Sequence, residues 1–184
     1  MTPSTAALMA EYNRWMNARM YDAAGKLDAA ALSADRGAFF GSILGTLNHL
    51  VVADLIWLRR FAPHPVSSQT LSALSAFPRP AALRETLADD LASLRALRQR
   101  LDEVIVQWAA ALTPELLASD LSYTSTAGIA SRRNFGALVQ HFFNHQTHHR
   151  GQASTLLFQA GVDVGVTDLL AVIPTSGPEE RPLR

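Results

Sequence analysis

The longest uninterrupted helical pattern of the chain runs from Ala81 to Leu112, and it restricts the fold more than any other feature. The segment contains neither glycine nor proline, and its leucines recur at spacings of three and four residues. This spacing places the leucines along one face of a helix. A helix with one apolar face has to bury that face against other elements. The segment therefore predicts one member of a helical bundle.

Apolar residues at helical spacing predict three more long helices, at about 3–26, 39–62 and 134–160. Thr2-Pro3 and Asn134 are typical of helix starts, and Gly161 is suited to a left-handed cap at a helix end. Residues 121–125 and 129–133 flank Thr126-Ala127-Gly128 and predict a short hairpin or extended chain. The expected fold class is all-α, a four-helix bundle with a small extended or hairpin segment before the last long helix.

The segments between the helices have the composition of connections. We expect loops at residues 28–37 and in the proline-rich segment 63–80. We expect residues 168–173 to dock on the helical bundle. Residues 175–184 have the composition of a loose tail. With 184 residues and no evident internal repeat, we expect a single domain over 1–184.

Composition excludes several classes of function. Sixteen basic residues balance sixteen acidic ones, so no net charge favours nucleic acid as a partner. The chain has no cysteine, which removes disulfides, thiolate metal sites and a cysteine nucleophile. No signal-like start or apolar run of membrane-spanning length occurs, so we expect a cytoplasmic protein that does not enter a membrane.

Four of the six histidines fall between His141 and Gln152, inside the last predicted helix. At about 100° per residue, His141, His145 and His149 lie within roughly 80° of one another, on the side of the apolar stripe. Buried imidazoles need partners, so these are either hydrogen-bonded core residues or metal ligands. Two histidines four residues apart suit a transition metal, but two overlapping pairs have this spacing, and spacing alone does not choose between them.

A third ligand from another helix would leave a coordination position free, which is the arrangement of catalytic metal sites. His49, in the second predicted helix, is the candidate, because His64 lies in the proline-rich connection. The zinc-protease motif is absent, since Gln146 and not glutamate follows His145. A Gly-x-Ser-x-Gly nucleophile motif is also absent.

Three further residues are weaker candidates for a catalytic role, and two of them, Asp54 and Arg150, have a plain structural alternative. Asp54, five residues after His49, can orient a ligand or accept a proton, or it can pair with an arginine. Tyr123 can reach the mouth of the site and donate a proton. Arg150 can bind a carboxylate, or form an ion pair inside the bundle.

Taken together, these motifs resemble the DinB-like family of damage-inducible proteins, which is distinct from the DNA polymerase of that name. The resemblance is carried by 143–152 (Phe-Asn-His-Gln-Thr-His-His-Arg-Gly-Gln), 45–49 (Gly-Thr-Leu-Asn-His), 54–59 (Asp-Leu-Ile-Trp-Leu-Arg) and 12–17 (Tyr-Asn-Arg-Trp-Met-Asn), and it spans about residues 8–170. It implies a four-helix bundle, commonly a homodimer, that binds a divalent metal, nickel or zinc. It also implies that His49, His145 and His149 are the ligands. His141 then becomes a residue that supports the ligands and His148 a residue at the rim.

The resemblance implies a site more directly than a reaction, and three hypotheses follow. The first is a metal-dependent S-transferase that directs a low-molecular-weight thiol at a small electrophilic substrate. The second is a metal-dependent hydrolase, in which a metal-bound hydroxide attacks an amide or ester. The third is a non-catalytic metal-binding, stress-associated dimer. The sequence names neither the metal, nor the thiol, nor the substrate.

Overall fold

The computed structural model describes residues 1–65 and 67–177, which are mostly helical with one small antiparallel hairpin. In chain order the elements are α1 (Pro3–Ala24), α2 (Ala29–Ser33), α3 (Ile43–Phe61), α4 (Ser67–Thr70), η1 (Ser72–Ala76), α5 (Leu91–Ala110), α6 (Pro114–Ala118), β1 (Asp120–Thr124), β2 (Ala130–Asn134), α7 (Phe135–Gln159) and η2 (Leu169–Val172). The predicted all-helical class and the hairpin before the last long helix are confirmed.

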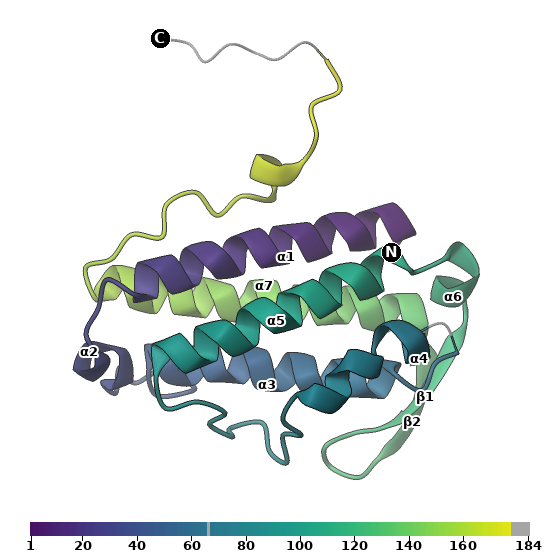
Figure 1. Cartoon of the computed structure of the whole chain (residues 1–184), viewed down its shortest axis with the longest axis horizontal. Helices are drawn as coiled ribbons and strands as arrows, with labels where there is room; N and C mark the ends of the chain where they lie inside the picture. Colours follow the sequence, from purple (N-terminus) through teal and green to yellow (C-terminus); the bar gives the residue numbers. More distant parts are fainter. Residues whose placement is uncertain (66, 178–184) are drawn as a thin grey trace.

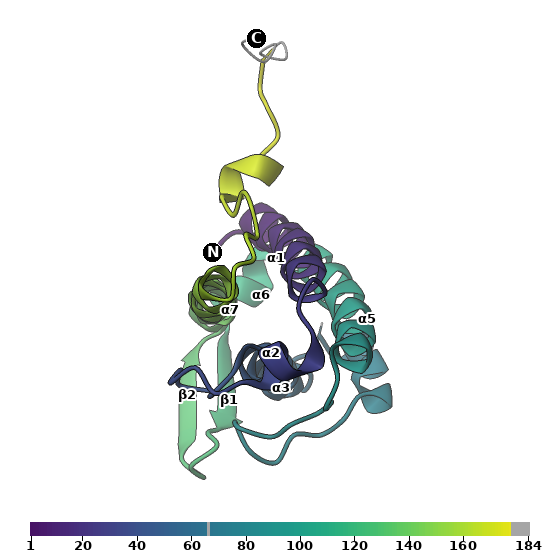
Figure 2. The same cartoon turned by 90° about the vertical axis from the view of Figure 1, so that its left-hand side faces the viewer.

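The four long helices α1, α3, α5 and α7 pack around one apolar core, as Figures 1 and 2 show from two directions. Helix α1 packs on α5 and α7, and α3 packs on the same two helices. Aromatic rings fill the end of the core nearest α6. Phe61 of α3 stacks on Trp108 of α5 with ring centroids 5.3 Å apart, and Phe142 of α7 meets both rings edge-on. The core therefore joins three of the long helices at this end.

The predicted boundaries of α1 and α7 are confirmed to within two residues, and local side chains satisfy free backbone groups where these helices begin. The Thr2 hydroxyl accepts a hydrogen bond from the Thr5 N–H, and the Asn134 side chain accepts one from the Ala137 N–H. Gly161 has a φ of 84°, in the left-handed region that favours glycine. Helix α7 therefore begins and ends close to where the sequence predicts.

The prediction of one helix from Ala81 to Leu112 is wrong in its first ten residues. Helix α5 begins at Leu91, and its N-cap is Asp90, whose carboxylate accepts a hydrogen bond from the Ser93 N–H. Residues 81–90 instead cross the outside of α3 without regular structure. Helical propensity is overridden here because side chains of α3 bind this backbone.

The second predicted helix also starts later than expected, at Ile43. The residues before it form a tight turn, in which an isolated bridge pairs Ala38 with Gly41. Two of its glycines, Gly37 and Gly41, have φ of 64° and 76°. Phe39 at the tip is 67 % exposed, so its place in the periodic pattern does not reflect burial in a helix.

The two segments predicted as connections contain short helices. Helix α2 lies in the first, capped by the Asp28 carboxylate, which accepts a hydrogen bond from the Ala31 N–H. The second holds α4 and η1, and Arg59 of α3 donates to the carbonyls of Leu74, Phe77 and Pro78 at its end. These contacts order a segment that composition alone describes as loop.

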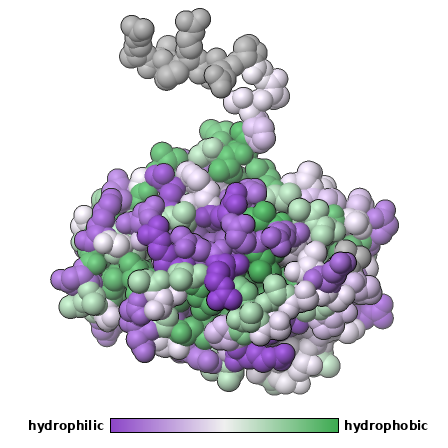
Figure 3. All heavy atoms as spheres, in the orientation of Figure 1, coloured by the Kyte–Doolittle hydropathy of each residue, from purple (hydrophilic) through white to green (hydrophobic). Residues whose placement is uncertain are grey.

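The chain after α7 runs back along α1. The Tyr12 hydroxyl donates to the Thr167 carbonyl at 2.6 Å, and η2 packs on α1, so the predicted docking of 168–173 is confirmed. Leu170 in η2 is nevertheless 76 % exposed, and Figure 3 shows an apolar cluster at this place, below the start of the tail. Most of the predicted tail, 178–184, lies outside the described residues. Among the helices described, none is both long and apolar enough to cross a membrane.

Candidate metal centre

The structure brings together three histidines from two helices that are far apart in sequence. His49 comes from α3, and His145 and His149 come from successive turns of α7. One ring nitrogen from each lies within 4.8 Å of the others. The Nε2 atoms of His145 and His149 are 3.1 Å apart. Two nitrogens bound tetrahedrally at roughly 2.0–2.1 Å from zinc would lie at a similar separation, about 3.4 Å.

Hydrogen bonds on the outer nitrogens orient two of these rings. His49 donates from Nδ1 to the Leu83 carbonyl at 2.9 Å, and Nδ1 of His149 lies 2.7 Å from Oε1 of Gln152. With Nδ1 protonated, each ring presents the lone pair of Nε2 to the cluster, as metal-ligating histidines do. Nε2 of His49 is buried and has no hydrogen-bond partner. Such an unpaired buried atom is costly in a structural residue and suits a ligand.

Burial keeps the three imidazoles neutral at physiological pH. It lowers the pKa of His49 to about 4 and that of His145 to about 3, and neighbouring imidazoles add to the effect in both. Burial also lowers the pKa of His149. A metal has to displace protons from its ligands, so histidines that stay neutral bind it without this competition. The donor set and the unpaired Nε2 thus fit a divalent transition ion.

Asn48, next to His49 on α3, holds the segment that orients His49. Its side-chain oxygen accepts hydrogen bonds from the Leu87 and Ala88 N–H groups, and its amide donates to the Ala88 carbonyl. The same segment supplies the Leu83 carbonyl to His49. Asn48 is therefore a positioning residue, and its contacts explain why residues 81–90 are not helical.

Phe40 covers one face of the cluster. Its ring stacks on His49 with centroids 3.7 Å apart and an interplanar angle of 16°, and it meets His149 edge-on at 5.5 Å. The turn can approach α3 this closely because residue 45 is glycine: a Cβ there would lie 2.2 Å from the Phe40 carbonyl oxygen. The guanidinium of Arg84 lies over both Phe39 and Phe40 from outside.

The other two histidines of α7 lie beside the cluster. His141 meets Trp57 edge-on at 5.0 Å, and its ring is 6.0 Å from that of His145. His148 is exposed, and the Gln152 amide lies 3.3 Å from its Nε2. Gln152 thus contacts both His148 and His149. His64 hydrogen-bonds to Ser119, away from the cluster.

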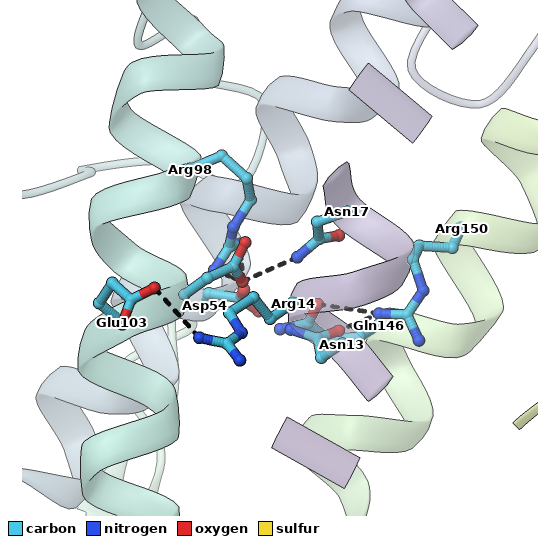
Figure 4. Close-up of polar contacts among 9 residues, drawn as sticks. Asn13, Arg14, Asn17, Asp54, Arg98, Glu103, Gln146 and Arg150 are labelled. Atoms are coloured by element: carbon cyan, nitrogen blue, oxygen red, sulfur yellow. Dashed lines mark hydrogen bonds and ion pairs between the residues drawn. The ribbon is translucent and has the colours of Figure 1, made fainter. Parts of the chain in front are cut away.

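Two of the three weaker candidates lie in a separate buried network between the helices. Asp54 is 1 % exposed and pairs with Arg98 at 2.5 Å, and Arg98 also pairs with Asp102 at 2.9 Å. Arg150 donates a hydrogen bond to Asn13 of α1, as Figure 4 shows, so its guanidinium is bound inside the protein. Burial raises the pKa of Asp54 to about 6 against the opposing effect of Arg98. The structural alternative for Asp54, an arginine pair, matches its surroundings. Arg150 instead donates hydrogen bonds to Asn13 and Gln146 and forms no ion pair with the described residues.

Tyr123, the third of the weaker candidates, lines the same pocket as His141. It is half-buried on β1 and packs on Trp57 at 5.5 Å, and Trp57 in turn contacts His141. Sequence reasoning missed Phe40, which it placed in a helix, and gave no role to Asn48 and Arg84. The one available signal was that Asn48 precedes His49 as Asn144 precedes His145, but Asn144 is exposed.

The comparisons with known proteins identify the family of the chain. The model of the DinB family matches residues 1–180. Protein DinB of Bacillus subtilis (strain 168) is 28 % identical over 159 residues, covering 86 % of this chain and 87 % of the relative. Among solved structures, none gives a significant match. The chain therefore belongs to the DinB family.

Proposed function

We propose that the chain is a single domain over 1–184, a four-helix bundle of the DinB type, that binds nickel or zinc through His49, His145 and His149. The observation that carries the proposal is the convergence of three neutral imidazoles around the buried Nε2 of His49, which has no other partner. Supporting contacts on Nδ1 of His49 and of His149 are those expected of metal ligands.

We further propose that the protein is a thiol-dependent S-transferase. His49, His145 and His149 would hold the divalent ion, which would supply a nucleophile near neutral pH by lowering the pKa of a bound thiol or water molecule. In an S-transfer the thiol gives its proton to solvent, its sulfur forms a bond with an electrophilic carbon, and a leaving group departs with the bonding electrons. The residues of the chain hold the electrophile and limit access of water.

Two features support the transferase over a hydrolase. Hydrolysis by activated water is helped by a nearby carboxylate base, and none of the described carboxylates belongs to the cluster. Glu85 lines the hollow at His49, but its carboxylate accepts hydrogen bonds from the Ala81 and Ala82 N–H groups. Asp54, the carboxylate nearest in sequence, is paired with Arg98 instead. The hydrolase remains the second candidate, because the same ion can activate water.

A non-catalytic metal protein needs no open space beside the cluster. A hollow of about 160 Å³ reaches His49 between Phe40 and Arg84, and larger hollows lie at His141 and at Gln152. Access for small molecules therefore supports an enzyme. The homodimer, the small-molecule substrate and the cytoplasmic location stay predictions.

Metal analysis tests the ligand set. We expect about one nickel or zinc ion per chain in the purified protein by elemental analysis, and loss of most of it in His49→Ala, His145→Ala and His149→Ala. His64→Ala is the matched control, because His64 bonds Ser119 outside the cluster. Unchanged metal content in His145→Ala would show that the ligand set is wrong.

Thiol consumption tests the reaction. The chain has no cysteine, so a colorimetric thiol assay has no background from the protein itself. We expect the metal-loaded protein, and not His145→Ala, to consume low-molecular-weight thiols in the presence of a panel of electrophiles. Ester or amide cleavage without thiol consumption would replace the transferase hypothesis by the hydrolase hypothesis. The absence of both activities would favour the non-catalytic protein.

A further inference from the structure

A pocket of about 580 Å³ lies beside the histidine cluster, between the hairpin, α3 and the first turns of α7. Its size is that of a small-molecule site. His141 lines this pocket and is also the neighbour of His145, with ring centroids 6.0 Å apart. A molecule held here therefore lies next to the candidate metal centre, with His141 between them.

One wall of the pocket is aromatic. Trp57 of α3 and Tyr123 of β1 both line it, with ring centroids 5.5 Å apart, and His141 meets the same Trp57 ring edge-on. Leu138 adds an apolar surface from α7. Flat apolar groups pack well on such rings.

The charge around the pocket is positive. Arg133 lines it, and none of the described carboxylates does. Strand register explains this placement: Leu121 pairs with Arg133 and Tyr123 with Ser131, so the side chains of Tyr123 and Arg133 share one face of the hairpin. Within the described part of the chain, Arg133 forms no ion pair, whereas its neighbour Arg132 pairs with Asp120 on the opposite face.

A second arginine strengthens this charge. The guanidinium of Arg60 lies 4.6 Å from the Trp57 ring centroid and 5.4 Å from that of Tyr123. Arg60 therefore lies against the two aromatic rings that line the pocket. The first turn of α7, which carries Ala137 and Leu138, adds the positive end of a helix dipole.

We propose that this pocket binds a small organic acid with a flat apolar body, whose carboxylate pairs with Arg133 and whose body packs on Trp57 and Tyr123. Arginine suits this role because its planar guanidinium matches a carboxylate with two parallel hydrogen bonds. The inference rests on the proposed function in one respect: the acid would be the electrophilic substrate, presented to the metal centre past His141.

Binding of three probes tests the pocket without any activity assay. Isothermal titration calorimetry on the metal-loaded protein would compare 3-phenylpropionate, its amide and acetate. We expect 3-phenylpropionate to bind at least tenfold more tightly than either of the others, because only it offers both the charge and the apolar body. Arg133→Ala should weaken its binding about tenfold or more.

The matched control is Arg132→Ala, one residue away on the other face of the hairpin, which should leave binding within about twofold. Both arginines are exposed, so neither substitution removes core contacts, and circular dichroism would confirm equal folding. Equal affinity for the acid and its amide, or equal effects of the two arginine variants, would overturn the proposal.

His145→Ala separates this inference from the proposed function. If 3-phenylpropionate still binds to metal-free His145→Ala within a few-fold of wild type, the pocket binds the acid by itself. If binding disappears there while acetate binds wild type as tightly as 3-phenylpropionate, the anion binds the metal and the pocket proposal is wrong. If His145→Ala keeps its metal, the proposed set of metal ligands is wrong. The comparison of Arg133→Ala with Arg132→Ala then still shows whether the pocket binds the acid.

Discussion

The ring of Phe40 lies nearly parallel to the ring of His49, with 3.7 Å between their centroids. This contact joins the turn before α3 to the candidate metal centre, so the turn forms part of the wall around the ligands. The Nε2 atom of His49 is buried although it has no hydrogen-bond partner. Phe40 thus helps to keep solvent away from Nε2 of His49 and leaves the lone pair of this atom available to a metal.

Removing the Phe40 ring should make the centre more accessible. In Phe40→Ala we expect a chelator to remove the metal severalfold faster, because water and chelator reach His49 where the ring lay. Phe39→Ala is the control, since Phe39 is 67 % exposed at the tip of the same turn. The measurement is the stopped-flow rate of metal transfer to a coloured chelator, and equal rates in the two variants would contradict the shielding role.

Gly45→Ala should displace the turn that carries Phe40. The added Cβ would lie 2.2 Å from the Phe40 carbonyl oxygen, which is backbone and can move only with the whole turn. We expect a loss of about 1–3 kcal/mol in unfolding free energy and faster metal release than in wild type. Gly151→Ala, on α7 with open space around the glycine, should not destabilise the protein. Urea unfolding would show whether the two alanine variants differ.

Asn48→Ala should loosen the segment that orients His49. It removes the acceptor of two backbone N–H groups and a donor to the Ala88 carbonyl, which should cost about 1–3 kcal/mol. Metal affinity should fall about 10-fold or more, because outer contacts of this kind set ligand orientation. Competition titration would measure it. Asn144→Ala, the exposed asparagine before His145, should change neither quantity.

Asp54→Ala should be strongly destabilising, because it leaves Arg98 buried with only Asp102 as a charged partner. We expect a cost of about 3 kcal/mol in chemical unfolding. The control is Asp22→Ala, which removes the Arg95–Asp22 pair at an exposed position and should cost less than about 1 kcal/mol. Similar losses in both variants would show that burial does not set the strength of the Asp54 contact.

The metal-free protein should lose stability as the solution becomes acidic. His49 has a folded pKa of about 4 against an ordinary value of 6.5, so the folded chain holds fewer protons than the unfolded chain between these values. The stability that His49 contributes is therefore complete above about pH 6.5 and is lost as the pH falls toward 4. His145 adds to this effect, with a pKa of about 3.

Thermal unfolding across this pH range checks the sign. The melting temperature of the metal-free protein should fall by several degrees from pH 7 to pH 4. His49→Gln, which removes one of the titrating rings, should show a smaller fall. An equal fall in the variant would mean that His49 does not contribute.

The sequence by itself determined the helical class, most helix ends and one half of the candidate centre. Apolar spacing and capping residues are local signals, and a spacing of four residues is enough to place His145 and His149 on one face of α7. Residue patterns also indicated the hairpin, because turn residues between two short extended segments act within a few positions. The resemblance was needed to choose this pair over His141 and His145. His49 was the candidate for the third ligand because it lies in a predicted helix and His64 does not, and the resemblance implied the same residue.

Only the tertiary structure decided what surrounds these ligands. Residues 81–90 have a helical pattern but are held irregular, because Asn48 and His49 bind their backbone across some 35–40 positions of sequence. Phe40 fits the periodicity of a helix and instead covers His49, since Gly45 admits the turn. Asp54 lies near His49 in sequence yet pairs with Arg98 of another helix. Such contacts depend on which side chains meet when helices pack, and no local spacing encodes that.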